Sequence, residues 1–278
     1  MEFLVTNDDG IRSAGIQVAV DLLLNFGNVY VVAPSEVQSG KSASLSLGQI
    51  LRVKESFESV KGSHKAHWVA LDGTPADCVK MGMQLFFQDH RPDFCFSGIN
   101  QGSNASIAAV YSGTLGAAAE ATIYAIPTIA FSIDTHNEHP DFSQVEKFYD
   151  TILRAFFKNP PKKGFYLNVN FPNLPAEQIK GIKFARMGRG RWIKEFDVQK
   201  DPFGKTIYWM VGKFQDFEEL EARGEALEED RFYSSTGDSE LLDADNKLVE
   251  QGYIAISVHK VDNSNVEEAQ RLSEAWKL

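Results

Sequence analysis

Hydrophobic residues in the first half of the chain alternate between short β-branched runs and longer helical patterns. Phe3 to Thr6 is a short apolar run, and Ile16, Val20 and Leu23 then follow at the spacing of a helix. The alternation continues, predicting further strands at 29–33, 51–54, 68–71, 93–97, 128–133 and 166–171, and helices at 15–26, 75–86, 112–124 and 142–157. Strands and helices that alternate in this way form parallel sheets covered by helices. We therefore expect an α/β fold with a mostly parallel sheet and helices on both faces.

The pattern changes after about Asn173. Alternating segments within 184–214 predict a β-hairpin excursion, and a late strand at 253–258 and a terminal helix at 267–277 follow. Because the chain shows no internal repeat and no low-complexity linker, we expect residues 1–278 to form a single domain. Its α/β core would span 1–183, and 184–278 would supply the hairpin, the late strand and the terminal helix.

Charge and cysteine content limit the classes of function. The formal net charge of −10 repels polyanions, so we expect no long nucleic acid as a partner. No apolar run reaches about 18 residues, and the first one ends at Val5, so we expect neither a membrane span nor a signal peptide. Cys78 and Cys95 lie in apolar contexts without the spacing of metal ligands, which fits a reducing compartment. We expect a cytoplasmic protein with a small-molecule substrate.

Two adjacent carboxylates follow the first predicted strand, in the segment Asn7-Asp8-Asp9-Gly10. Ligands of open parallel sheets bind at the carboxyl ends of the strands. Two neighbouring carboxylates repel each other there unless a cation compensates them, and hard oxygen ligands favour Mg²⁺ or Mn²⁺ over zinc. The alternative is an Asx turn that caps the following helix. The dipeptide by itself leaves both interpretations open.

Two further loops are expected to open on the same edge of the sheet. The second strand leads to a loop with Ser39 and Gly40, and the strand at 93–97 leads to a loop with Asn100 and Asn104. Ser39 and Asn100 are neutral oxygen donors that can complete a metal shell. Each residue alone is typical of turns, so their joint position at one sheet edge is the stronger indication.

The Ala-rich helix predicted at 112–124 begins with Ser112-Gly113-Thr114. A helix N-terminus presents free N–H groups and partial positive charge, and therefore binds phosphate well. Ser112 and Thr114 add hydroxyl donors, although a plain N-cap is the alternative. The chain has no P-loop and no Gly-x-Gly-x-x-Gly fingerprint, which argues against an NTPase and an NAD enzyme.

These segments, with Asp72 to Val79 and Leu167 to Asn170, resemble the SurE family of nucleotidases in their residues and in their order. The resemblance implies a Rossmann-like α/β fold, a hairpin-bearing C-terminal part, and homodimers or homotetramers that exchange C-terminal elements through the terminal helix. It also implies one divalent metal ion per subunit, Mg²⁺ or Mn²⁺, and hydrolysis of 5′- and 3′-nucleoside monophosphates with some action on polyphosphate. The metal ligands that it implies are Asp8, Asp9, Ser39 and Asn100. The chain departs from the family's usual residues at Ala14, Ala105, Ala121 and 256–260, none of which is a matched ligand.

The resulting hypothesis is metal-assisted hydrolysis of phosphomonoesters, with Asp8, Asp9 and Asn100 as catalytic residues. The residues assigned to substrate and phosphate binding are Asn7, Gly40, Asn104, Ser112, Gly113 and Thr114. Two alternatives remain: an exopolyphosphatase or general phosphomonoesterase, and a non-catalytic nucleotide-binding protein on the same scaffold.

Three other groups of residues are interpreted as ordinary surface. His136 and His139 lie in a polar loop without a third ligand. The arginines of 186–191 form a basic loop that can approach phosphate, although a solvated turn is the simpler interpretation. The acidic stretch from Asp216 to Arg231 is expected to be solvated.

Overall fold

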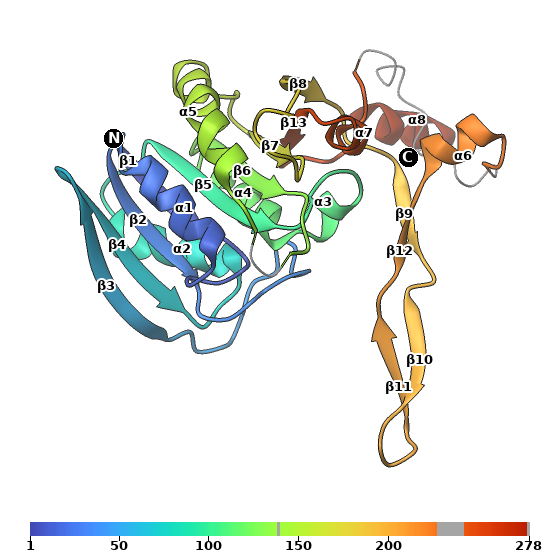
Figure 1. Cartoon of the computed structure of the whole chain (residues 1–278), viewed down its shortest axis with the longest axis horizontal. Helices are drawn as coiled ribbons and strands as arrows, with labels where there is room; N and C mark the ends of the chain where they lie inside the picture. Colours follow the sequence, from blue (N-terminus) through green and yellow to red (C-terminus); the bar gives the residue numbers. More distant parts are fainter. Residues whose placement is uncertain (138–139, 227–241, 277–278) are drawn as a thin grey trace.

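The computed structural model describes residues 1–137, 140–226 and 242–276. Within these ranges the main sheet has nine strands in the order β3-β4-β2-β1-β5-β6-β7-β13-β8 (Figure 1). Six neighbouring strands, from β4 to β7 in that order, run parallel, whereas β3 and β13 pair antiparallel with β4 and β7. The strands are β3 (Val53–Lys61), β4 (His64–Leu71), β2 (Asn28–Pro34), β1 (Glu2–Thr6), β5 (Phe94–Gln101), β6 (Thr128–Ile133), β7 (Phe165–Phe171), β13 (Ile254–Lys260) and β8 (Ile182–Ala185).

Helices cover both faces of this sheet, as the sequence predicts. On one face α1 (Ala14–Leu23) and α5 (Ser143–Lys158) pack on Phe3 and Val5 of β1. On the other face α2 (Pro75–Phe86) and α4 (Gly113–Ile123) pack around Leu4. This alternation along β1 follows from the period of two in a strand, which points successive side chains to opposite faces. The predicted three-layer α/β fold is confirmed.

Strand order reverses between β1 and β5. From β1 the chain adds β2 and β4 on one side, whereas β5, β6 and β7 extend the sheet on the other side. The loops that leave β1 and β5 therefore diverge at their carboxyl ends, which is where open α/β sheets bind ligands. The short helix α3 (Ala108–Tyr111) lies between β5 and α4 at this edge (Figure 1).

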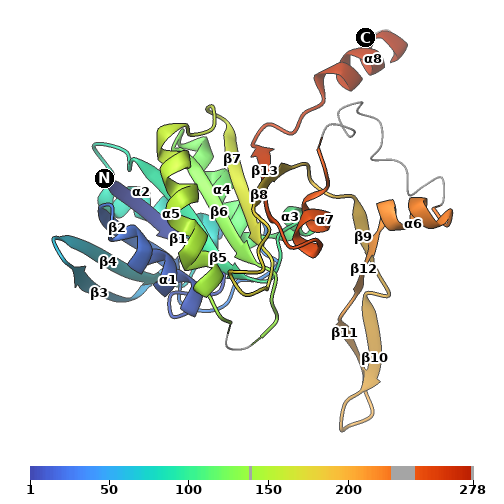
Figure 2. The ribbon, with the colours of Figure 1, turned by 45° about the horizontal axis from the view of Figure 1, so that its top comes forward.

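The C-terminal part forms a long two-stranded arm that leaves the sheet (Figures 1 and 2). Its base pairs β9 (Gly190–Ile193) with β12 (Lys213–Asp216), and its outer half pairs β10 (Phe196–Lys200) with β11 (Thr206–Met210). This is the predicted hairpin excursion. All residues of β10 and β11 are exposed, including large apolar side chains such as Trp209 at 61%.

The segments after the arm return to the sheet. Helix α6 (Phe217–Arg223) follows β12 directly, and α7 (Asp245–Glu250) precedes β13, which lies between β7 and β8. The terminal helix α8 (Val266–Trp276) agrees with the predicted one, except that Lys277 lies outside the described residues. Among the residues described, no helix is long and apolar enough to span a bilayer.

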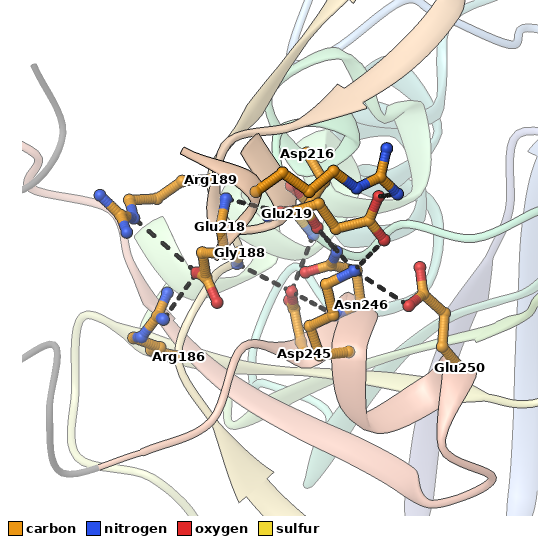
Figure 3. Close-up of polar contacts among 12 residues, drawn as sticks. Arg186, Gly188, Arg189, Asp216, Glu218, Glu219, Asp245, Asn246 and Glu250 are labelled. Carbon is orange, nitrogen blue, oxygen red and sulfur yellow. Dashed lines mark hydrogen bonds and ion pairs between the residues drawn. The ribbon is translucent and has the colours of Figure 1, made fainter. Parts of the chain in front are cut away.

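The predicted solvated loop at 186–191 is wrong in one respect. Arg186 donates to Glu218 at 2.6 Å (Figure 3). Arg189 donates to Glu221 at 2.9 Å, so α6 neutralises these two arginines. Both arginines are half-buried, because the arm base folds back beside α6. The acidic stretch from Asp216 therefore begins as an ion-paired helix, and its last residues, 227–231, lie outside the described residues.

Candidate active site at the carboxyl edge of the sheet

The first carboxylate after β1 is held by the N-terminus of α4. Asp8 is only 4% exposed, and its Oδ1 accepts a hydrogen bond from Thr114 Oγ1 at 2.5 Å. The backbone N–H groups of Gly113 and Thr114 also face this carboxylate. A helix N-terminus stabilises negative charge, so the first turn of α4 stabilises the Asp8 carboxylate itself.

The second carboxylate contacts the end of β5. Asp9 Oδ2 accepts the backbone N–H of Gln101 at 2.8 Å, which places Asp9 beside Asn100. Asn100 is 8% exposed, and its amide nitrogen donates to Gly102 O at 2.7 Å. Because that bond uses the nitrogen, the oxygen is the Asn100 side-chain atom left to ligate a cation.

The loop after β2 lies against the same place. Gln38 N donates to the carbonyl of Asp8 at 2.7 Å. A Cβ added to Gly113 would lie 2.9 Å from Asp8 Oδ2 and 3.2 Å from Gln38 O, so glycine is needed where the three segments meet. Ser39 and Gly40 follow Gln38 and are exposed, and Gly40 has a φ of +72°. The loops that carry Asp8, Ser39, Asn100 and Thr114 therefore meet at one edge.

Two predicted phosphate-binding residues use their side chains to shape the site. Asn7 Nδ2 donates to Gly10 O at 2.9 Å and to Ser13 Oγ at 2.8 Å, which closes the loop before α1. Ser112 is the N-cap of α4, and its hydroxyl accepts the N–H of Leu115 at 3.1 Å. The plain N-cap is thus present at Ser112. The alternative Asx turn is not, because α1 has Ser13 as its N-cap, and Asp8 and Asp9 instead accept from Thr114 and Gln101. A role of Asn7 and Ser112 in phosphate binding stays a prediction.

Asn104 sits in a buried polar network. Its Nδ2 donates to Ser132 Oγ at 2.8 Å, its backbone N–H donates to Asn170 Oδ1 at 2.8 Å, and its carbonyl accepts from Asn168 Nδ2 at 2.9 Å. Asn170 in turn donates to Asn168 Oδ1 at 3.1 Å. Side chains of the adjacent strands β6 and β7 thus fix the loop at Asn104 by hydrogen bonds.

Comparison with known proteins identifies the family. The family model described as "Survival protein SurE" matches residues 3–194. The chain belongs to the SurE family. A protein named 5′-nucleotidase SurE from Christiangramia forsetii is 39% identical over 253 residues, covering 91% of this chain and 88% of the relative. Another of that name from Flavobacterium johnsoniae is 36% identical over 275 residues, covering 99% and 96%. The crystal structure of the SurE protein from Aquifex aeolicus superposes with a TM-score of 0.74 at 30% identity, covering 99% of this chain and 100% of that one.

The electrostatics of this SurE edge are those of an uncompensated carboxylate pair. Burial and, after it, the charge of Asp8 raise the pKa of Asp9 to about 6, against the opposing effect of the Gln101 N–H. Burial also raises the pKa of Asp8, against the hydrogen bonds from Thr114 and Gly113. Within the described part of the chain neither carboxylate forms an ion pair with a basic side chain. A nearby cation would lower both pKa values.

The donor set at this edge fits a hard divalent ion. Carboxylate, amide and hydroxyl oxygens are the ligands that Mg²⁺ and Mn²⁺ prefer. The buried Asn7 Oδ1 has no hydrogen-bond partner in the described residues, which adds a further free oxygen beside the pair. Among the described residues, no group of three or more His, Cys, Asp or Glu side chains could hold a metal ion. His139, one of the two histidines considered in the sequence, lies outside the described residues. An ion here would depend on two carboxylates and neutral oxygens, as the resemblance implies.

Sequence reasoning missed several residues that support the site. Gln101 acts through its backbone, which no side-chain pattern reveals. Asn168 and Asn170 belong to the segment named in the resemblance, but no role was assigned to them; the available signal was two buried polar residues at alternate positions of β7. Asp245 accepts the N–H of Gly188 at 2.9 Å (Figure 3) and the N–H of Ser106 at 2.9 Å, and so ties the loop after Asn104 to the base of the arm.

Proposed function

We propose that this chain is a divalent-metal-dependent phosphatase that hydrolyses nucleoside 5′-monophosphates, and 3′-monophosphates as well, to nucleoside and phosphate. The observation that carries the proposal is the pair of buried carboxylates, Asp8 and Asp9, placed between the N-terminus of α4 and the end of β5. The relatives named 5′-nucleotidase SurE, at 36–41% identity, support the same activity.

The proposed site holds one Mg²⁺ or Mn²⁺ ion between Asp8, Asp9, Ser39 and Asn100. Such an ion, when bound, polarises the phosphoryl group and lowers the pKa of a coordinated water. Thr114 orients Asp8 by donating to its Oδ1 and opposes the rise that burial causes in the pKa of this carboxylate. The Gln101 N–H occupies Oδ2 of Asp9, so Oδ1 is the atom that would ligate the ion and orient the attacking water by accepting its hydrogen bond.

Substrate binding is assigned to residues around this pair. Asn104, whose backbone N–H is held by Asn170, is proposed to donate to the phosphate. Gly113 lets Asp8 and the loop at Gln38 approach α4 closely, and is proposed to shape the phosphate site in this way. Gly40, with its positive φ and open surroundings, gives the Ser39 loop room to adjust around the ligand.

Phosphate release from AMP, GMP, 3′-AMP and tripolyphosphate, with Mn²⁺, with Mg²⁺ and with EDTA, tests the proposal. We expect metal-dependent release from the nucleotides. Faster turnover of tripolyphosphate than of any nucleotide would favour an exopolyphosphatase. Tight metal and nucleotide binding without turnover would favour a binding protein.

We also propose that the chain acts as a homodimer or homotetramer in the cytoplasm. The exposed apolar residues of the arm, such as Phe203 at 88% and Tyr208 at 68%, support assembly through this element, because isolated proteins rarely expose such a surface. The free thiols of Cys78 and Cys95 are buried and fit a reducing compartment. Insertion of β13 between β7 and β8 supports a single domain over 1–278. Light scattering of the purified chain tests the assembly.

A further inference from the structure

A cavity of about 220 Å³ lies between the loop after β5 and the base of the arm. It is bounded by residues of the loop 103–106, by Asp134 and His136, by Glu250 at the end of α7, and by Trp192 and Phe214 at the base of the arm. Pockets for drug-sized ligands measure roughly 300–1,000 Å³. This smaller volume fits one ring system rather than a whole nucleotide.

The aromatic wall of the cavity is preformed. Trp192 and Phe214 face each other across the β9–β12 pair, with ring centroids 5.9 Å apart at 65°. They remain 40% and 36% exposed, so each ring keeps surface for a ligand. Aromatic side chains with free surface are where proteins stack nucleobases.

A buried hydroxyl also lines this cavity. Ser106 is 2% exposed, and its Oγ has no hydrogen-bond partner among the residues that the structure describes. Its backbone is fixed in a left-handed conformation, with a φ of +56°, by the bond from its N–H to Asp245. A buried hydroxyl without a partner costs free energy, and a polar ligand atom would remove that cost.

The cavity and the carboxylate pair lie at the two ends of one loop. Gln101 contacts Asp9, and Ser103, which lines the cavity, is two residues further on. Two residues of extended chain span at most about 7 Å. The phosphate of a mononucleotide at Asp8 and Asp9 therefore leaves its base within reach of the cavity.

The negative charge of the cavity lining determines which end of a nucleotide can enter the cavity. Asp134 and Glu250 make the lining acidic, which repels a phosphate dianion but accepts hydrogen bonds from a base. The Asp134 carboxylate interacts electrostatically with His136 in the same lining, and its oxygens accept no hydrogen bond from the described residues. An ionised carboxylate accepts two parallel donors, and the N1–H and N2–H₂ groups of guanine present such a pair. Adenine presents one donor beside an acceptor, which a carboxylate repels.

We propose that this cavity binds the base of the nucleotide substrate, that Trp192 and Phe214 stack on it, and that Asp134 favours guanine over adenine. The proposal rests on the proposed nucleotidase function for its biological meaning. Base binding itself requires neither a metal ion nor hydrolysis.

Calorimetric titration with guanosine, which carries no phosphate, tests the cavity without the reaction. We expect the wild type to bind guanosine more tightly than adenosine. Trp192→Leu is expected to weaken guanosine binding by about fivefold or more, and Asp134→Asn to abolish the preference over adenosine. Phe57→Leu, on the exposed edge strand β3 and outside the cavity, is the control and is expected to bind as the wild type does. Asp134 lies on an exposed loop, so its variant provides a reading even where Trp192→Leu fails to fold.

Steady-state kinetics with GMP, AMP and ribose 5-phosphate separate base binding from the reaction. In Trp192→Leu we expect kcat/KM to fall for GMP far more than for ribose 5-phosphate, which has no base. Equal losses for both substrates, or unchanged guanosine binding in Trp192→Leu, would overturn the proposal. Selective guanosine binding by a protein that hydrolyses none of the three would instead reject the nucleotidase function and leave the base site standing.

Discussion

The hydroxyl of Thr114 donates to the carboxylate of Asp8 at 2.5 Å, joining the first turn of α4 to the loop after β1 across 106 residues of sequence. Both residues are buried, at 0% and 4% exposure, so water cannot replace this bond. The bond opposes the effect of burial and helps to keep Asp8 ionised.

Replacing Thr114 with valine removes this donor without changing the shape of the side chain much. We expect a loss of about 1–3 kcal/mol in the free energy of unfolding and a marked fall in kcat. Thr122→Val is the matched control, because Thr122 is buried in the same helix and its hydroxyl donates to Ala118 O at 2.8 Å, away from Asp8. Urea unfolding and AMP hydrolysis measure both effects. Equal activities of the two variants would contradict the proposed role.

Replacing Asp9 with asparagine separates stability from activity. We expect turnover to fall by about two orders of magnitude or more, because a metal ligand and proton acceptor is lost. The melting temperature without metal is expected to hold or rise, since the repulsion between Asp8 and Asp9 disappears. Mn²⁺ is expected to raise the melting temperature of the wild type but not of the variant. Asp150→Asn, at an exposed ion pair with Arg154, is the control. Near-normal turnover of Asp9→Asn would remove the metal site from the mechanism.

Replacing Asn170 with alanine tests how the loop at Asn104 is held. The variant leaves the buried N–H of Asn104 without its acceptor, at a cost of about 1–3 kcal/mol. If Asn104 binds phosphate, KM for AMP rises more than kcat falls. Asn173→Ala, at an exposed position just beyond β7, is the control and is expected to change neither the free energy of unfolding nor KM for AMP. A loss of stability with unchanged KM would limit Asn170 to a structural role.

Replacing His259 with phenylalanine tests the acid sensitivity of the C-terminal strand. Burial lowers the pKa of His259 to about 4 from its usual 6.5, and its ring stacks on Tyr166. Between these pH values the unfolded chain binds a proton that the folded chain does not bind, so stability falls as the pH drops. His259 accounts for a loss of about 2 kcal/mol between pH 7 and pH 5.

Urea midpoints at pH 7 and pH 5 measure this effect, and the difference between wild type and variant isolates His259 from the raised carboxylates, whose effect has the opposite sign. We expect the variant to lose less stability than the wild type as the pH falls. Equal losses in the two proteins would show that His259 does not titrate in this range.

The order of elements and the residues of the candidate site followed from the sequence. The spacing of hydrophobic residues distinguishes a strand from a helix locally. A parallel sheet places the loops that follow its strands on one edge. Asp8, Ser39 and Asn100 could therefore be assigned to neighbouring loops from the sequence. The expected strand at 51–54 was nevertheless too short and began two residues too early, since β3 begins at Val53. β3 continues to Lys61 as an exposed edge strand, where burial imposes no apolar alternation.

The sequence by itself determined the α/β layering, the arm and the identity of the polar loops, because these depend on local periodicity and on residue type. Only the tertiary structure decided which polar atoms meet: Thr114 with Asp8, Gln101 N with Asp9, Asp245 with Ser106, and Arg186 with Glu218. Such contacts join segments far apart in the chain. They depend on how whole elements pack, and several use backbone groups that every residue carries, so no residue pattern marks them.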